Sequence, residues 1–219
     1  MKNADTPRDR SRRRRSKGAG GDSSGRTAII DAAIASILEV GFYRSSTNEI
    51  ARRADVSWGA LQYHFGTREA LLLAIVQEVD RRFLADIQDA HIEGDTFEER
   101  ITALYELLAR HYDNPAYLVR LQIVLNLQHD PNTSTDVMAE VSQTAAKAEA
   151  SVRRLLRETM GADAQRAKTE AVFHALRGFA FSQQLSAAVP VDGSRRRQPE
   201  AVRLFLHSLA CAEDAYADV

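Results

Sequence analysis

The chain of 219 residues is 44% hydrophobic and 27% charged, with a mean hydropathy of −0.34, a balance typical of a soluble globular protein. Its longest apolar run, Ala70 to Val76, is too short to cross a bilayer, so we expect no membrane partner. The single cysteine, Cys211, excludes an internal disulfide and a thiolate zinc site. A formal net charge of −1 argues, for the chain as a whole, against a nucleic-acid binder.

The charge is unevenly distributed along the chain. Residues 1–26 carry nine basic and three acidic side chains, whereas the other 193 residues carry 20 basic and 27 acidic ones. The first segment is also rich in Gly and Ser and has almost no apolar residues with which to offset the entropy of ordering. We therefore predict a disordered basic arm over residues 1–23, whose cations are concentrated at Arg12, Arg13, Arg14, Arg15 and Lys17.

The rest of the chain has the hydrophobic periodicity of helices. From Ser24 onward apolar residues recur three and four positions apart, which predicts an all-α fold of about nine helices. The first helix ends at Gly41 and has an apolar face formed by Ile30, Ala33, Ile34, Ile37 and Leu38. Later helices are expected at about 68–92, 96–112, 115–129, 133–160, 163–188 and 199–215, between Gly- and Pro-containing breaks.

Two short capped helices lie between the first helix and the long one. Ser46 begins a helix that ends at Ala54, and Glu49 completes a capping box with it. After a short turn, Ser57 caps a second helix that ends near Phe65. This spacing is typical of a helix-turn-helix, whose second helix lies in the major groove of DNA. Ile50, Ala51, Val56, Leu61 and Phe65 would face inward, which leaves Ser57, Trp58, Ala60, Tyr63 and His64 facing outward.

At these residues the chain resembles the TetR family of transcriptional regulators. The similar stretches are Gly41 to Ala51 and Ala54 to Leu71. The resemblance implies an N-terminal three-helix helix-turn-helix DNA-binding domain over residues 24–70 and a larger C-terminal helical ligand-binding and dimerisation domain over residues 71–219. It also implies a cytoplasmic, nucleoid-associated regulator, most commonly a repressor, that binds a palindromic double-stranded DNA operator as a homodimer and is released by a small-molecule effector.

Two positions depart from the family pattern. Asp55 stands where the family usually has Gly in the turn, and Asp tolerates a left-handed backbone better than most residues, so we expect the turn to be kept. Gln62 stands where the family often has Tyr. Its role is open, because it loses an aromatic contact and could instead reach a base edge.

The resemblance also implies which residues contact DNA. Ser46 and Thr47 would bind phosphate at a helix start, and base edges would be approached by Ser57, Trp58, Gly59 and Ala60. Further phosphate contacts would come from Tyr63, His64, Thr67 and Arg68.

The charge of the expected DNA-binding region is unfavourable for phosphate. Residues 27–80 carry four basic and seven acidic side chains. We therefore expect the basic arm, through Arg12 to Arg15 and Lys17, to supply the missing attraction from the adjacent minor groove or along the backbone. The alternative is a solvated tail that only aids solubility.

The C-terminal helices suggest a ligand pocket and a dimer interface. Aromatic or polar-tipped residues suited to a small amphipathic ligand are Tyr105, His111, Tyr112, Tyr117, Asn126, Phe173, His174, Arg177 and Phe181, of which the last four are favoured as a cluster. Surplus apolar side chains on the last two helices, namely Val172, Leu176, Phe179, Leu185, Val202, Leu204, Phe205 and Leu209, predict a four-helix interface with a second copy.

Other classes of function fit less well. Six histidines show no metal-ligand spacing and no Gly-rich phosphate loop follows a strand, so we expect no enzyme activity, no metal and no cofactor. A constitutive DNA-binding regulator without a small-molecule ligand stays open, as does a helical adaptor that binds protein. Arg195 to Arg197 are interpreted as a solvated loop of open function.

Overall fold

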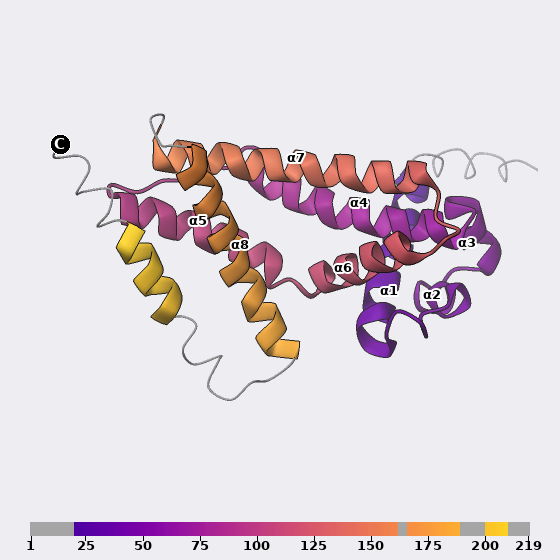
Figure 1. The fold of residues 1–219 in the computed structure, drawn as a ribbon. Coiled ribbons are helices and arrows are strands. Elements are labelled where there is room, and N and C mark those ends of the chain that lie inside the picture. Colours follow the sequence, from indigo (N-terminus) through magenta and orange to yellow (C-terminus); the bar gives the residue numbers. More distant parts are fainter. Residues whose placement is uncertain (1–19, 162–165, 189–199, 210–219) are drawn as a thin grey trace, which may run out of the picture. The chain divides into compact units, whose positions relative to one another are not determined.

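The computed structural model describes residues 20–161, 166–188 and 200–209, and these residues form nine helical segments with no strand between them. The expected all-α fold is therefore confirmed. The cations at positions 12–17, the loop at 195–197 and the predicted helix end at 210–215 lie outside the described residues. The helices in chain order are α1 (Gly20–Val40), α2 (Thr47–Arg53), α3 (Trp58–Phe65), α4 (Arg68–Ile87), α5 (Phe97–Tyr112), α6 (Pro115–His129), α7 (Thr135–Met160), α8 (Arg166–Ala188) and an unlabelled helix at 200–209 (Figure 1).

Most helix boundaries lie within a few residues of those expected, but α4 ends earlier. It was expected to reach residue 92, and it ends at Ile87. A side chain from α7 explains the difference, because Arg154 Nη2 donates to the carbonyls of Ile87 and Gln88, at 3.0 and 2.9 Å. The last carbonyls of α4 thus have a partner that does not require another helical turn.

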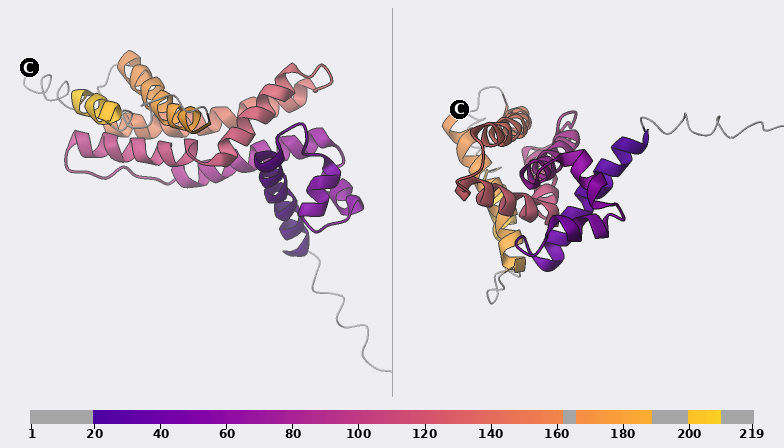
Figure 2. Two further views of the ribbon diagram at one scale, coloured as in Figure 1. Left: turned by 90° about the horizontal axis from the view of Figure 1, so that it is seen from below. Right: turned by 90° about the vertical axis from the view of Figure 1, so that its right-hand side faces the viewer.

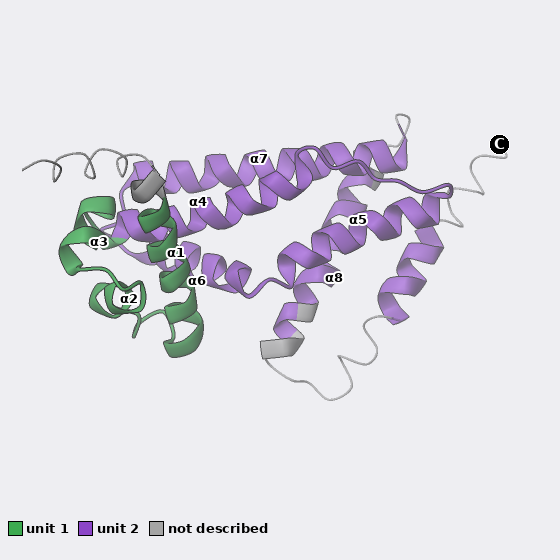
Figure 3. Cartoon of the chain, turned by 180° about the vertical axis from the view of Figure 1, so that it is seen from behind, with its two compact units in different colours: residues 1–68 green, residues 69–219 purple. Residues whose placement is uncertain are grey.

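The chain divides into two compact units, unit 1 over residues 1–68 and unit 2 over residues 69–219 (Figure 3). In unit 1, α2 packs on both α1 and α3. Its core combines Ile30 and Ile37 of α1 with Ile50 of α2 and Leu61 of α3, all buried. The expected apolar face of α1 was wrong at Leu38, which is exposed, since the face continues toward the N-terminus through buried Ile29 instead.

Unit 2 has a core built mainly from α5, α7, α8 and the helix at 200–209, including buried Leu104, Leu155, Leu176 and Leu206. Within this unit α4 and α7 run in the same direction, side by side (Figures 1 and 2). Gln77 Nε2, halfway along α4, donates to Glu140 Oε2 at 2.8 Å, and Arg154 of α7 bonds the C-terminal end of α4. Within the described ranges, no helix combines the length and the apolar character needed to cross a membrane.

Candidate nucleic-acid interface and ligand cavity

The first short helix, α2, has the cap predicted for it but only half of the capping box. Ser46 Oγ accepts a hydrogen bond from the Glu49 amide at 3.2 Å. The Glu49 carboxylate does not complete the box; it accepts from Arg52 Nε and Nη2 at 3.0 and 2.8 Å and from Arg53 Nε at 2.6 Å. The Arg52 hydrogen bond, followed by that of Arg53, lowers the pKa of Glu49 to about 2. Both arginines of α2 are therefore neutralised within unit 1.

The turn after α2 keeps the geometry of a helix-turn-helix. Asp55 has a φ of 52°, the left-handed region, as the sequence predicted for this position. The Val56 amide donates to the Ala51 carbonyl at 3.0 Å, which closes the turn. A residue other than Gly therefore supplies the required backbone reversal.

The second short helix, α3, presents aromatic side chains to solvent. Ser57 Oγ caps it by accepting from the Ala60 amide at 3.1 Å, and Leu61 is buried in the core of unit 1. On the outer face, Trp58 is 55% exposed and Tyr63 is 78% exposed. Ser57, Gly59 and Gln62 are exposed as well, whereas Ala60 and His64 are half-buried. Large aromatic side chains on an open surface indicate a surface that meets a partner.

The start of α1 packs against the end of α3. A Cβ atom added at Gly25 would lie 3.2 Å from His64 Nε2, and the Arg26 guanidinium carbon lies 5.3 Å from the centre of the Phe65 ring. The Tyr63 and His64 rings meet edge-on, with centroids 5.5 Å apart. His64 is therefore held between α1 and Tyr63, which accounts for its partial burial.

Arg68, expected to extend toward phosphate, is turned inward in the structure. Its Nη1 donates to the Ser45 carbonyl at 2.7 Å and its Nη2 to the Phe42 carbonyl at 3.3 Å. The guanidinium carbon lies 5.4 Å from the centre of the Phe42 ring, and burial lowers the pKa of Arg68. Two carbonyls and a ring face satisfy this cation, so it fixes the turn between α1 and α2. Thr67, beside it, is exposed.

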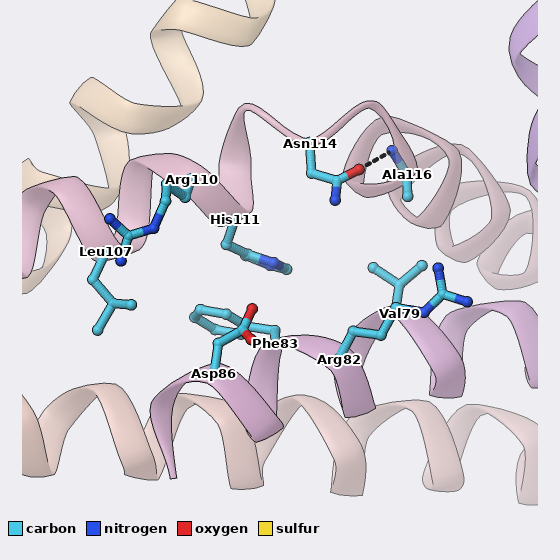
Figure 4. Close-up of a pocket in the computed structure, with 9 residues that line it drawn as sticks. All are labelled: Val79, Arg82, Phe83, Asp86, Leu107, Arg110, His111, Asn114 and Ala116. Atoms are coloured by element: carbon cyan, nitrogen blue, oxygen red, sulfur yellow. Dashed lines mark hydrogen bonds between the residues drawn. The ribbon is translucent and has the colours of Figure 1, made fainter. Parts of the chain in front are cut away.

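Unit 2 contains a cavity of about 320 Å³ between α4 and α5 (Figure 4). Positions 79, 82, 83 and 86 of α4 face positions 107, 110 and 111 of α5, the spacing that puts residues on one helix face, and the start of α6 adds Asn114 and Ala116. The Phe83 and His111 rings stack with centroids 3.7 Å apart and an interplanar angle of 14°. The lining residues are Val79, Arg82, Phe83, Asp86, Leu107, Arg110, His111, Asn114 and Ala116.

The structure brings together four of the residues expected to bind a ligand: His111, Tyr112, Tyr117 and Phe181. Tyr117 makes edge contacts with the other three rings, at centroid distances of 5.0, 4.8 and 6.1 Å. Burial, reinforced by the charge of Arg120, lowers the pKa of His111 to about 4, and burial raises the pKa of both tyrosines. The cluster is therefore neutral near pH 7.

The other expected ligand residues lie elsewhere. Two guanidinium groups lie over the Phe173 ring, with the guanidinium carbon of Arg153 4.6 Å and that of Arg177 5.0 Å from its centre. His174 is exposed beside Arg177. Tyr105 is buried and lines a second cavity of about 240 Å³ against the helix at 200–209, and Asn126 Nδ2 donates to the Gln122 carbonyl within α6. Of the favoured four, Phe173, His174 and Arg177 lie together, whereas Phe181 packs on Tyr117.

Known proteins resemble the chain most clearly in unit 1. A family model described as "Bacterial regulatory proteins, tetR family" matches residues 29–75, which run from α1 into α4. The fatty acid metabolism regulator protein of Bacillus subtilis (strain 168) is 28% identical over 100 residues, or 46% of this chain and 50% of the relative. The chain therefore spans about half the length of this relative.

Solved structures share the fold over most of the chain. The multidrug binding protein EbrR, complexed with imidazole, aligns with a TM-score of 0.54 and 25% identity over 84% of this chain and 94% of that one. The regulator FadR from Bacillus subtilis, in complex with stearoyl-CoA, aligns with a TM-score of 0.59 and 16% identity over 82% and 96%. A helix-turn-helix unit followed by a larger helical unit is common to these chains.

Proposed function

We propose that this chain, which belongs to the TetR family of bacterial regulatory proteins, is a transcriptional repressor that binds a palindromic operator as a homodimer and releases it when a small molecule binds. It would act in the cytoplasm, at the nucleoid. The observation that carries the DNA-binding part is the outer face of α3, where Trp58 and Tyr63 are exposed on a short helix capped by Ser57. In a helix-turn-helix this second helix enters the major groove.

Six of the ten expected DNA contacts have a place in this proposal, whereas Arg68 is engaged by backbone carbonyls within unit 1. Trp58, Gly59 and Ala60 lie in the first turn of α3, where recognition helices approach base edges, and the Trp58 ring suits a thymine methyl group. Exposed Ser46 and half-buried Thr47 lie at the start of α2 and would contact phosphate. Tyr63 would contact phosphate through its hydroxyl. Gln62, also exposed, is available for a base edge.

The homodimer is supported by apolar surface on the last two helices. Leu185 on α8 is 48% exposed and Leu204 on the helix at 200–209 is 58% exposed. Phe179 and Phe205 join these two helices, with ring centroids 5.2 Å apart, and both are only partly buried. By contrast Val172, Leu176 and Val202, also expected at the interface, are part of the core of unit 2. A second copy would cover the leucines and provide the two-fold symmetry that a palindrome requires.

The effector site is proposed at the α4–α5 cavity and the adjoining aromatic cluster of His111, Tyr112, Tyr117 and Phe181. Its mixture of aromatic, aliphatic and charged lining suits a small amphipathic molecule. A ligand that binds one geometry of α4 more tightly would shift the population of dimers away from the spacing that fits two half-sites. The stearoyl-CoA bound by FadR belongs to a relative in fold alone, so the effector class is left to experiment.

The test begins with selection of DNA fragments from a random pool by the purified protein. We expect enrichment of a palindromic site, and loss of about 5- to 150-fold in affinity for it in Trp58→Ala, since a well-placed base contact is worth about 1–3 kcal/mol. The matched control is Leu125→Ala, which removes an exposed side chain of similar accessibility on α6 in unit 2. Failure to enrich any palindrome would contradict the proposal.

The effector is tested with the selected site. A panel of small amphipathic molecules is screened for release of the DNA, with His111→Ala and Phe83→Ala as cavity variants. Release that both variants weaken supports the α4–α5 cavity. Binding of the palindrome without release by any compound favours a constitutive regulator.

A further inference from the structure

The arginines of unit 1 differ in what their charge is used for. Residues 24–68 contain five arginines and four acidic residues. Arg52 and Arg53 pair with Glu49 and Glu39, Arg26 lies over the Phe65 ring and Arg68 donates to two backbone carbonyls. Arg44 is exposed, and among these described residues it alone has a guanidinium with no acidic, carbonyl or aromatic partner.

Arg44 lies in the α1–α2 turn, residues 41–46, and the backbone of this turn is held from several sides. The Ser45 amide donates to the Gly41 carbonyl at 3.1 Å and the Ser46 amide donates to the Arg44 carbonyl at 2.9 Å. Ser45 Oγ donates to the buried Ser36 Oγ of α1 at 2.9 Å. With the two hydrogen bonds from Arg68, the turn is fixed both to α1 and to the first residue of α4.

The side chains at the tip of this turn face solvent. Tyr43 is 88% exposed, and its ring meets the Phe42 ring edge-on at 5.4 Å, with the Arg68 guanidinium over Phe42 in turn. An exposed phenol and an unpaired guanidinium therefore stand next to each other on a rigid backbone. Arg and Tyr are donors commonly used to hold DNA phosphates, and a fixed backbone reduces the entropy lost on binding.

We infer that Arg44, with Tyr43 beside it, is a DNA phosphate-binding element of unit 1. The turn leads directly into α2, the helix that crosses the phosphate backbone in a helix-turn-helix. Arg44 supplies a cation where the other arginines of residues 24–68 are engaged within the unit. The contact rests on the proposed DNA-binding function and adds affinity for any sequence, because phosphates carry no sequence information.

The test compares salt dependence in full-length variants. Arg44→Ala lowers affinity for both the selected palindrome and a random duplex, about three- to tenfold at 0.1 M salt, and reduces the slope of log K against log salt by about 1 for each protomer bound. Arg44→Lys keeps the slope, since it keeps the charge. Tyr43→Phe lowers affinity without changing the slope, because it removes a neutral donor.

The matched control is Arg52→Ala. Arg52 is also an exposed arginine, but it pairs with Glu49, which keeps Arg53 as a second partner. Its loss leaves the slope unchanged. Circular dichroism checks that both proteins are folded. If wild type and Arg44→Ala then have the same slope of log K against log salt, the inference is overturned and the proposed function is left intact. A wild-type protein that binds no duplex at low salt overturns the proposed function itself.

Discussion

The Asp80 carboxylate on α4 accepts two hydrogen bonds from the Arg120 guanidinium on α6, from Nε to Oδ1 at 2.5 Å and from Nη2 to Oδ2 at 3.0 Å. Both side chains are largely removed from solvent, at 4% and 13% exposure. The pair joins two helices of unit 2 beside the aromatic cluster, where the charge of Arg120 also acts on His111. Such a pair specifies which residues of α4 and α6 meet.

Replacing one partner of this pair is expected to lower the unfolding free energy more than replacing both. Arg120→Met leaves a buried carboxylate without its cation, which costs about 3–5 kcal/mol of unfolding free energy. Asp80→Leu combined with Arg120→Met restores most of that loss, because both desolvation costs disappear. Urea unfolding of the three proteins measures the effect. A double variant as unstable as Arg120→Met would contradict mutual neutralisation as the role of the pair.

The left-handed turn at Asp55 gives a second prediction. Asp55→Gly leaves stability unchanged or raises it slightly, since Gly adopts a φ of 52° without steric cost. Asp55→Val lowers the unfolding free energy by about 1–2 kcal/mol, because a β-branched residue is strained there. Thermal unfolding distinguishes the two. Equal melting temperatures for the Gly and Val variants would show that the turn relaxes to another conformation.

Burial of His111 predicts a pH dependence of stability. Its pKa is lowered from 6.5 to about 4 in the folded protein, so between these values the unfolded chain binds a proton that the folded chain does not. Lowering the pH from 6.5 to 4 therefore reduces the unfolding free energy, by up to about 3 kcal/mol from this residue. His111→Phe keeps a flat ring against Phe83 and should weaken the dependence. Urea unfolding at several pH values measures the unfolding free energy of both proteins. The same change of unfolding free energy with pH in wild type and His111→Phe would refute the prediction.

Exposed Leu204 predicts how the proposed dimer is disrupted. Leu204→Glu places a charge in the interface, so light scattering after gel filtration should show a monomer at micromolar concentration. Loss of the dimer also lowers the affinity for the palindrome, because each half-site is then bound independently of the other. Leu125→Glu, on α6, is the control with comparable exposure and keeps the dimer. If Leu204→Glu is still a dimer, the interface does not include this part of the helix at 200–209.

Deletion of residues 1–19 tests the basic arm while keeping α1 from its first residue. We expect weaker binding to DNA and a flatter slope of log K against log salt, by up to about 0.9 for each arm cation that neutralises a phosphate. Replacing Arg12 to Arg15 with Gln in the full-length chain should reproduce most of the change. If the deletion and the Gln variant both keep the wild-type slope of log K against log salt, the arm does not contact DNA and is a solvated tail.

Local signals were sufficient for the helices and for the outer face of α3. The caps Ser46 and Ser57, the left-handed Asp55 and the order of apolar residues act over three or four positions, so they could be read before any tertiary contact was known. The exposure of Trp58 and Tyr63 follows from the same periodicity. What periodicity did not indicate was Arg44, because an isolated arginine in a turn looks like any solvated charge.

The sequence by itself determined an all-α chain with a helix-turn-helix and the residues that its second helix presents. Only the tertiary structure decided which long side chains are engaged: Arg68 reaches carbonyls more than 20 residues away, and Asp80 meets Arg120 across 40 positions. Phe181 was separated from the other favoured ligand residues for the same reason, since it packs on Tyr117 while Arg153 and Arg177 lie over Phe173. Spacing along one helix determines a shared face, but the partner of that face is chosen by packing between helices distant in sequence.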